Sequence, residues 1–283
     1  MAVNKNLHKA KREKNDEFYT QLIDIEKELE HYKEHLKGKI IYCNCDKQES
    51  KFNTYFSTNF ERLQIKKLLI SDGDFRNEEC IELLKQSDIV VTNPPFSLFR
   101  KYVAQLMEYE KKFLILGPIN AITYKEIFPV IKENKMWLGP SIYSGDREFQ
   151  IPESVVNLDQ VSTIRIGKNG KKIYITKAIV RWYTNLSHKK RNEELILVQN
   201  YKGSENDYPK YDNYDAIEVS RVKNIPKDYN GAMGVPISFL DKHNPNQFEI
   251  LGQMANTKID AFNFGYPFVN KKRKYARIII KRK

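Results

Sequence analysis

Cysteine and long apolar runs are both scarce in this chain, and each absence excludes a class of protein. The 283 residues include three cysteines, Cys43, Cys45 and Cys80, which are too few for a disulfide framework and lack paired metal-ligand spacing. Cys43 and Cys45 alternate on a predicted strand, so their thiols point the same way. Reduced cysteines in the core are favoured over a zinc site. No apolar run approaches the roughly 18 residues of a membrane span, and the N-terminus is too polar for a secretory signal. We therefore expect a cytoplasmic protein without membrane segment or metal.

Negative charge is also in deficit, with 36 Asp and Glu against 48 Lys and Arg, a net charge of +12. This excess favours a polyanionic partner, although ribosomal and membrane-surface proteins share it. A hydrophobic content of 41% suffices for a packed core, in one large domain or one domain with an appendage. Eight cations lie in the last thirteen residues: Lys271, Lys272, Arg273, Lys274, Arg277, Lys281, Arg282 and Lys283.

One stretch carries a chemical signal: an apolar run, residues 89–92, stops abruptly at Asn93-Pro94-Pro95-Phe96. The run predicts a buried parallel strand, and the prolines end it because each lacks an N–H and fixes φ. Asn93 therefore lies at the carboxyl end of a central strand, the edge where open α/β sheets bind ligands. The alternative is a plain strand-ending turn, since Asn and Pro are common turn formers.

Such a turn suits methyl transfer to an exocyclic amine. The amino nitrogen of adenine or cytosine is conjugated into its ring and is a poor nucleophile. If the Asn93 side-chain oxygen and the Pro94 carbonyl each accept one N–H, the lone pair is freed to attack a sulfonium methyl. Pro95 helps to hold the turn rigid, and Phe96 lies against the base.

Four segments together resemble the EcoRI-type adenine-specific DNA methyltransferase family, from about Lys11 to the end. They are Asn15-Asp16-Glu17-Phe18-Tyr19-Thr20, Ile41-Tyr42-Cys43-Asn44-Cys45-Asp46, Asn93-Pro94-Pro95-Phe96 and Val180-Arg181-Trp182-Tyr183-Thr184-Asn185-Leu186. The resemblance implies S-adenosylmethionine as cofactor and N6 of a flipped-out adenine in duplex DNA as target. It also implies an α/β fold, a Rossmann-like methyltransferase sheet with a smaller, mixed C-terminal target-recognition region.

The resemblance also implies roles for single residues. Phe18, Tyr19 and Thr20 line the methionine end of the cofactor, and Asp74 with Phe75 clamps its adenine. We assign Asn44 and Asp46, in the glycine-free turn after the first strand, to cofactor contacts, with ordinary turn residues as the alternative. Trp182 and Tyr183 supply aromatics for the target base beside Phe96, and buried core aromatics are the alternative for both.

The connection before Asp74 is shorter than the resemblance predicts. A doubly wound sheet needs a further strand and helix between the ribose-binding acid and the Asp-Phe pair, yet only Asp72 and Gly73 follow Ser71 before Asp74. Either a segment is missing or the cofactor pocket is abbreviated. The ribose-binding acid therefore stays unassigned.

Alternating patterns predict a parallel sheet flanked by helices. Strands are expected at 39–45, 66–70, 89–92, 111–117 and 136–138, and helices at 52–63, 78–86 and 122–134, the last bent near Pro129. Antiparallel strands follow at 162–166, 172–176 and 178–183, and a last strand at 276–280. We place a methyltransferase domain at residues 1–187 and a DNA-binding, target-recognition region at 188–283. Cations assigned to the DNA backbone are Lys189, Lys190, Arg191, Lys271, Lys272, Arg273 and Lys274.

The sequence leaves other functions open. The same turn serves N4 of cytosine and the amide of a protein glutamine, and the short connection suits a DNA-binding protein that has lost catalysis. The expected partner is double-stranded DNA, with a separate restriction endonuclease in a restriction-modification system. We expect a monomer.

Overall fold

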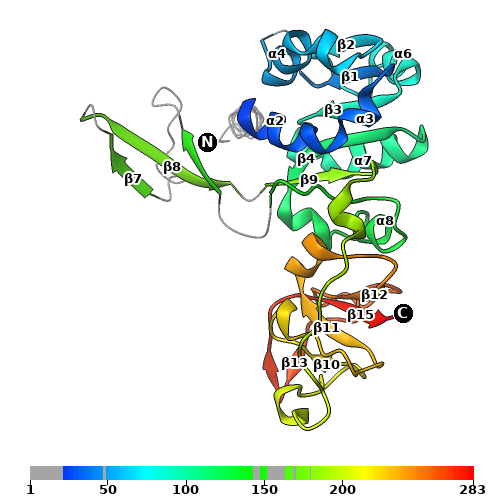
Figure 1. Ribbon diagram of the computed structural model, residues 1–283, viewed down its shortest axis with the longest axis vertical. Coiled ribbons are helices and arrows are strands. Elements are labelled where there is room, and N and C mark those ends of the chain that lie inside the picture. The colour runs from blue at the N-terminus through cyan, green and yellow to red at the C-terminus, as the bar shows by residue number, and fades with distance from the viewer. Residues whose placement is uncertain (1–21, 47–48, 143–146, 152–162, 168–169, 179) are drawn as a thin grey trace, which may run out of the picture. The chain divides into compact units, whose positions relative to one another are not determined.

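The computed structural model describes residues 22–46, 49–142, 147–151, 163–167, 170–178 and 180–283. In these ranges the chain is a mixed α/β protein with a central sheet of parallel and antiparallel strands (Figure 1). It divides into two compact units, one of residues 1–120 and 141–186 and the other of residues 121–140 and 187–283. No helix in the described ranges is long and apolar enough to cross a bilayer.

The sheet of the first unit is built from short apolar strands. They are β1 (Ile40–Asn44), β2 (Lys67–Ser71), β3 (Ile89–Thr92), β4 (Lys112–Pro118) and β9 (Val180–Thr184). They lie in the order β2-β1-β3-β4-β9; the first four are parallel, and β9 is antiparallel to β4 (Figure 1). Strands predicted at 39–45, 66–70, 89–92 and 111–117 are confirmed to within a residue at each end.

Helices connect the parallel strands, as crossovers between parallel strands require. Before β1 come α2 (Leu22–Leu29) and α3 (Lys33–Leu36). The connections are α4 (Lys51–Thr58) with α5 (Phe60–Leu63), then α6 (Glu78–Gln86), then α7 (Phe99–Glu108). Ser50 caps α4, since its hydroxyl accepts the Asn53 N–H at 3.0 Å. In the sheet, β2 lies on one side of β1 and β3 lies on the other, so the strand order reverses at β1. Open α/β sheets bind ligands at such a reversal.

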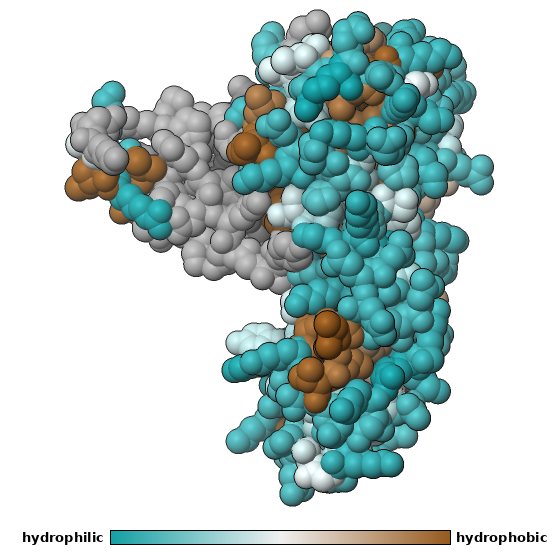
Figure 2. All heavy atoms as spheres, viewed as in Figure 1, coloured by the Kyte–Doolittle hydropathy of each residue, from teal (hydrophilic) through white to brown (hydrophobic). Residues whose placement is uncertain are grey.

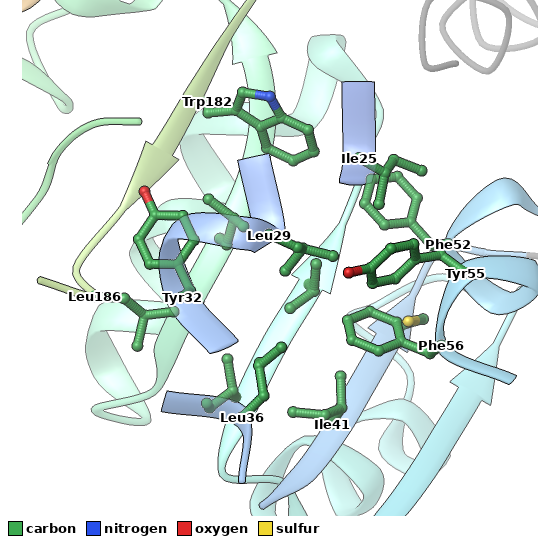
Figure 3. Close-up of a cluster of buried hydrophobic side chains, with 14 of the residues drawn as sticks. Ile25, Leu29, Tyr32, Leu36, Ile41, Phe52, Tyr55, Phe56, Trp182 and Leu186 are labelled. Atoms are coloured by element: carbon green, nitrogen blue, oxygen red, sulfur yellow. The ribbon is translucent and has the colours of Figure 1, made fainter. Parts of the chain in front are cut away.

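The main core lies on one face of this sheet. Alternate strand residues point the same way, so Ile41 and Cys43 of β1 share a cluster with Val91 of β3 and Trp182 of β9. The helical side of the cluster comes from α2 and α4, whose side chains converge in Figure 3: Ile25, Leu29, Phe52, Tyr55 and Phe56. The intervening strand residues, Tyr42, Val90, Phe113 and Ile115, are buried as well. Burial on both faces explains the nearly continuous apolar runs.

Between β4 and β9 the chain makes two excursions. The first begins with a 3₁₀ turn (Ile119–Thr123) and continues in the second unit with α8 (Phe128–Lys132) and β5 (Trp137–Leu138). The single helix predicted over 122–134 is therefore wrong: α8 begins at Phe128 with Pro129 in its first turn, where the missing N–H does not matter. The second excursion forms a three-stranded antiparallel sheet of β6 (Arg147–Ile151), β7 (Thr163–Ile166) and β8 (Lys172–Ala178), in the order β6-β8-β7.

The second unit has its own sheet, in the order β10-β11-β15-β12. These strands are β10 (Ile217–Glu218), β11 (Met233–Pro236), β12 (Phe248–Met254) and β15 (Arg277–Arg282), and a separate hairpin joins β13 (Phe268–Val269) to β14 (Lys272–Arg273). A buried ion pair between Arg277 and Glu218 at 2.5 Å ties β15 to β10. The strand predicted at 276–280 is confirmed.

Candidate active site at the carboxyl ends of the strands

The Asn-Pro-Pro-Phe motif leaves β3 at the carboxyl edge of the sheet. Asn93 is half-buried, Pro94 is buried, and Phe96 packs at the margin of the main core while keeping part of its ring accessible. The motif closes in a 3₁₀ turn (Phe96–Leu98) in which the Leu98 N–H donates to the Pro95 carbonyl at 2.9 Å. The turn thus uses the carbonyl of the second proline, whereas the proposed amine contact uses that of the first.

Helix α7 begins directly after the motif, and a glycine in β4 positions it. A Cβ built on Gly117 would lie 2.2 Å from the Phe99 ring, so only glycine lets this ring pack there. The same ring lies 5.0 Å from that of Tyr183, between centroids. Gly117 was not singled out from the sequence, although a glycine inside a strand pattern is a signal of close approach.

A threonine joins the ends of β1 and β3. The Thr92 hydroxyl donates to the Asn44 carbonyl, and its oxygen lies 2.6 Å from Oδ2 of Asp46. Asp46 is itself buried, and its N–H donates to the Ser71 carbonyl at 3.0 Å. This hydrogen bond connects the end of β2 to the ends of β1 and β3. Sequence reasoning missed Thr92 and Ser71, because a hydroxyl at the last position of a strand carries no signal of its own.

The glycine-free turn after β1 is made by a cysteine in the left-handed region, Cys45 with φ 64°. Its N–H donates to Oδ1 of Asn44 at 2.8 Å, and the Ser71 hydroxyl donates to the same oxygen at 3.2 Å. Asn44 is fully buried, and its Nδ2 has no hydrogen-bond partner among the described residues. Burial, followed by the charge of Asp46, raises the pKa of the Cys45 thiol well above its usual range, so this cysteine is no thiolate nucleophile.

At the end of β2 the Asp-Phe pair is engaged within the protein. The Asp74 carboxylate accepts the Arg76 Nε–H at 2.8 Å, and this hydrogen bond is the main cause that lowers the pKa of Asp74 to about 2. Phe75 is buried edge-on against Tyr102, with 4.8 Å between ring centroids. The amide of Gln105 also donates to the Phe75 carbonyl at 3.0 Å. The pair is thus held against α7.

The other predicted aromatic residues divide between core and margin. Trp182 is fully buried and meets Phe52 edge-on at 6.0 Å between centroids. Tyr183 is buried too, and its hydroxyl donates to the Pro118 carbonyl at 2.8 Å. Of the three aromatics predicted to meet the target base, Phe96 alone keeps an accessible ring. Phe18, Tyr19 and Thr20 lie outside the described residues.

The predicted DNA-contacting cations of the second unit fall into two groups. Arg191 is held by its own unit: its guanidinium lies 4.1 Å from the Trp137 ring centroid, its Nη2 donates to Asn134 at 2.7 Å, and burial lowers its pKa to about 10. Lys190 donates to the Pro140 carbonyl at 3.3 Å. The exposed cations are Lys189, Lys271, Lys272, Arg273 and Lys274.

Comparison with known proteins identifies the family. The pattern of the family described as "Adenine-specific methyltransferase EcoRI" matches residues 6–71 and again residues 68–283. The chain belongs to this adenine-specific methyltransferase family. It is 46% identical to Type II methyltransferase M.EcoRI of Escherichia coli over 100% of the chain and 98% of that protein. It is 39% identical to M.MgeORF184P of Mycoplasma genitalium and 38% identical to M.MpnI of Mycoplasma pneumoniae, each over 98% of both chains.

The same alignments locate a difference from the family. The alignment with M.EcoRI covers 327 positions whereas this chain has 283 residues, so at least 44 positions have no residue here. The family pattern breaks into two matches that meet at residues 68–71, the end of β2. This is the connection that the sequence predicts to be too short. The match to the family is therefore interrupted at the end of the edge strand β2.

A methyl donor fits one end of this edge better than the other. Beside β1 and β3, the buried Asn44 side chain lies by the Tyr102 hydroxyl, so a contact to the donor would come from the backbone of the left-handed turn at the half-buried Cys45. Beside β2, Phe75 is packed against Tyr102 and offers no face. The residues present therefore suit the donor at the β1–β3 end.

Proposed function

We propose that this protein transfers a methyl group from S-adenosylmethionine to N6 of an adenine extruded from duplex DNA. The observation that carries the proposal is the Asn-Pro-Pro-Phe motif at the carboxyl end of β3, beside the point where the strand order reverses. Family membership and the positive net charge support adenine in DNA over cytosine or a protein glutamine. The proposal includes a Rossmann-like sheet for catalysis and the second unit for target recognition.

The chain's own residues would position the amine. The Asn93 side-chain oxygen and the Pro94 carbonyl accept its two N–H groups, which turns the nitrogen lone pair toward the donor. Bound S-adenosylmethionine supplies an electrophilic methyl group on its sulfonium. Phe96 stacks on the extruded base and offsets about 1–3 kcal/mol of the cost of leaving the helix. No strong base is required, because the methylated nitrogen is acidic and loses its proton readily.

The donor would lie at the end of β1, beside β3, and extend toward the end of β2. We assign the contacts to Asn44, Asp46, Asp74 and Phe75, with Phe18, Tyr19 and Thr20 at the methionine end. The hydrogen bond between Thr92 and Asp46 favours a fixed position for this carboxylate. Asp74 and Phe75 would have to leave Arg76 and Tyr102 to clamp an adenine ring. The enzyme would act as a monomer, with any partner endonuclease acting separately.

Replacing Asn93 with alanine tests the chemistry. Loss of one preorganised acceptor predicts a fall of at least about a hundredfold in the single-turnover rate, with little change in donor affinity because Asn93 meets the amine. Asn77→Ala is the matched control, since Asn77 is exposed and its side chain makes no capping hydrogen bond to α6. Mass spectrometry of the digested product distinguishes N6-methyladenine from N4-methylcytosine. Full activity in Asn93→Ala would refute the assignment.

A second candidate function is DNA binding without efficient methylation. The specific observation in its favour is the missing segment at the end of β2, together with the burial of Phe75. Calorimetric titration with S-adenosylmethionine separates the two functions, because only the enzyme needs to bind the donor.

A further inference from the structure

The hairpin formed by β7 and β8 has an unusual composition. Between Thr163 and Ala178 the sequence contains no acidic residue and five cations: Arg165, Lys168, Lys171, Lys172 and Lys177. The two strands pair in antiparallel register, with Ile164 opposite Tyr174 and Ile166 opposite Lys172. The hairpin is therefore a basic part of the three-stranded sheet β6-β8-β7, which is separate in its hydrogen bonding from the main sheet.

One face of β7 is apolar and open to solvent. Ile164 and Ile166 are two residues apart, so they project from the same face of the strand, and their exposed fractions are 50% and 77%. Figure 2 shows apolar side chains beside hydrophilic ones where Figure 1 labels β7. Within the described residues β7 is an edge strand, because it pairs with β8 alone. An exposed apolar edge strand is a site where another molecule can bind.

The charge of the hairpin indicates which partner fits. Its uniform positive charge opposes edge-to-edge pairing with a second copy, since two such hairpins repel each other. The same charge complements the phosphates of a duplex. Isoleucine is among the apolar residues that contact thymine methyl groups or wedge between base steps.

We propose that the β7–β8 hairpin is a DNA-contacting element whose exposed Arg165, Lys171 and Lys172 lie along phosphates and whose Ile164 and Ile166 reach the base edges. The inference rests on the proposed function, because it takes duplex DNA as the substrate. It adds a contact surface in the first unit to the cations of the second.

The charges are tested by salt dependence. Lys171→Gln with Lys172→Gln should lower the salt slope of DNA affinity by about 0.9 for each phosphate contact removed. The loss should be equal on cognate and random duplexes, because phosphate contacts carry no sequence information. Lys66→Gln with Lys67→Gln is the matched control, because these adjacent lysines are exposed at the start of β2, an edge strand of the main sheet. An unchanged slope in the hairpin variant would overturn the phosphate contacts.

The apolar face is tested by specificity. Ile164→Ser with Ile166→Ser should weaken binding to a duplex with one mapped methylation site by about tenfold, the order of one lost base contact. Binding to random DNA should change much less. Ile196→Ser with Val198→Ser is the matched control, since these exposed residues, 83% and 65%, also lie two apart but in the second unit. Equal losses on both duplexes, or a change in oligomeric state by light scattering, would overturn the base contact.

The outcomes separate this inference from the proposed function. Normal methylation by both hairpin variants, with wild-type DNA affinity, would overturn the hairpin contact and leave the enzyme assignment intact. A wild-type protein that does not methylate DNA, but whose salt slope still depends on the hairpin lysines, would refute the enzyme assignment and support the hairpin contact. The charge test on random DNA requires no methyl transfer.

Discussion

The ends of β3 and β2 lie at one edge of the same sheet, yet they are built differently. At the end of β3, Thr92 contacts both Asn44 and Asp46, so the Asn-Pro-Pro-Phe motif leaves a braced strand. At the end of β2, Asp74 is bonded to its neighbour Arg76 and Phe75 is packed away against Tyr102. The first end is braced by contacts between strands, whereas the second satisfies its own groups locally. The difference coincides with the break in the family match at the end of β2.

The largest expected effect comes from breaking the braced end. Thr92→Val removes a hydroxyl that joins Asn44 and Asp46, and leaves a buried carbonyl and carboxylate without that donor. The free energy of unfolding should fall by about 1–3 kcal/mol. Urea denaturation measures the change.

Thr54→Val provides the control for this substitution. The Thr54 hydroxyl donates to the Ser50 carbonyl at 3.0 Å on an exposed turn of α4, so its loss should cost less than about 0.5 kcal/mol. Equal effects of the two variants would mean that the bracing at β3 contributes nothing beyond an ordinary surface hydrogen bond.

A smaller effect is expected at the end of β2. If Asp74 holds the adenine of the donor, Asp74→Ala should weaken S-adenosylmethionine binding by about tenfold, whereas Glu79→Ala, an exposed acid in the first turn of α6, should not. Because the pKa of Asp74 is about 2, its carboxylate stays charged throughout any assay near neutral pH. Its stabilising contribution is present above the ordinary carboxyl pKa and is lost as the pH falls through about 2.

Arg76→Ala sharpens the same comparison. It frees the carboxylate from its internal partner, so donor affinity should rise if Asp74 is a ligand that must leave Arg76 first. Unchanged affinity in both variants would place the adenine contact elsewhere, and would favour a pocket lost with the segment.

The sequence predicted the strands at both ends but not the packing around them, for physical reasons. Continuous apolar runs fix buried strands, so β1, β3 and the place of Asn93 followed from local pattern. The left-handed conformation of Cys45 did not follow from local pattern, because tertiary hydrogen bonds from Ser71 and Thr92 to Asn44 impose this conformation. The burial of Phe75 depends on a ring contributed by α7, far along the chain.

The same limit applies to charge. A run of cations shows composition but not partners, so Lys189, Lys190 and Arg191 looked alike in sequence. The structure separates them, because Arg191 is packed on Trp137 while Lys189 is exposed. Such packing depends on residues more than fifty positions away and has no local signal.

The smallest effect per residue is expected from the exposed cations of the second unit. Lys271 and Lys272 stand at the β13–β14 turn, which Asp212 holds by accepting the Asn270 and Lys271 backbone N–H groups at 3.0 and 2.7 Å. The turn can therefore present its charges from a fixed backbone. Replacing Lys271, Lys272 and Lys274 with Gln should lower the salt slope of DNA affinity by about 0.9 per contact, equally for cognate and random duplexes.

A triple replacement of Lys202, Lys223 and Lys227 with Gln is the control, because it removes the same net charge from exposed positions of the same unit. If Lys271, Lys272 and Lys274 contact phosphates, the salt slope of their triple variant falls further than that of the control variant. Equal slopes would mean that net charge alone attracts DNA and that these three lysines belong to an ordinary solvated face. A loss confined to cognate DNA would instead mean that these side chains read bases, because only base contacts distinguish one sequence from another.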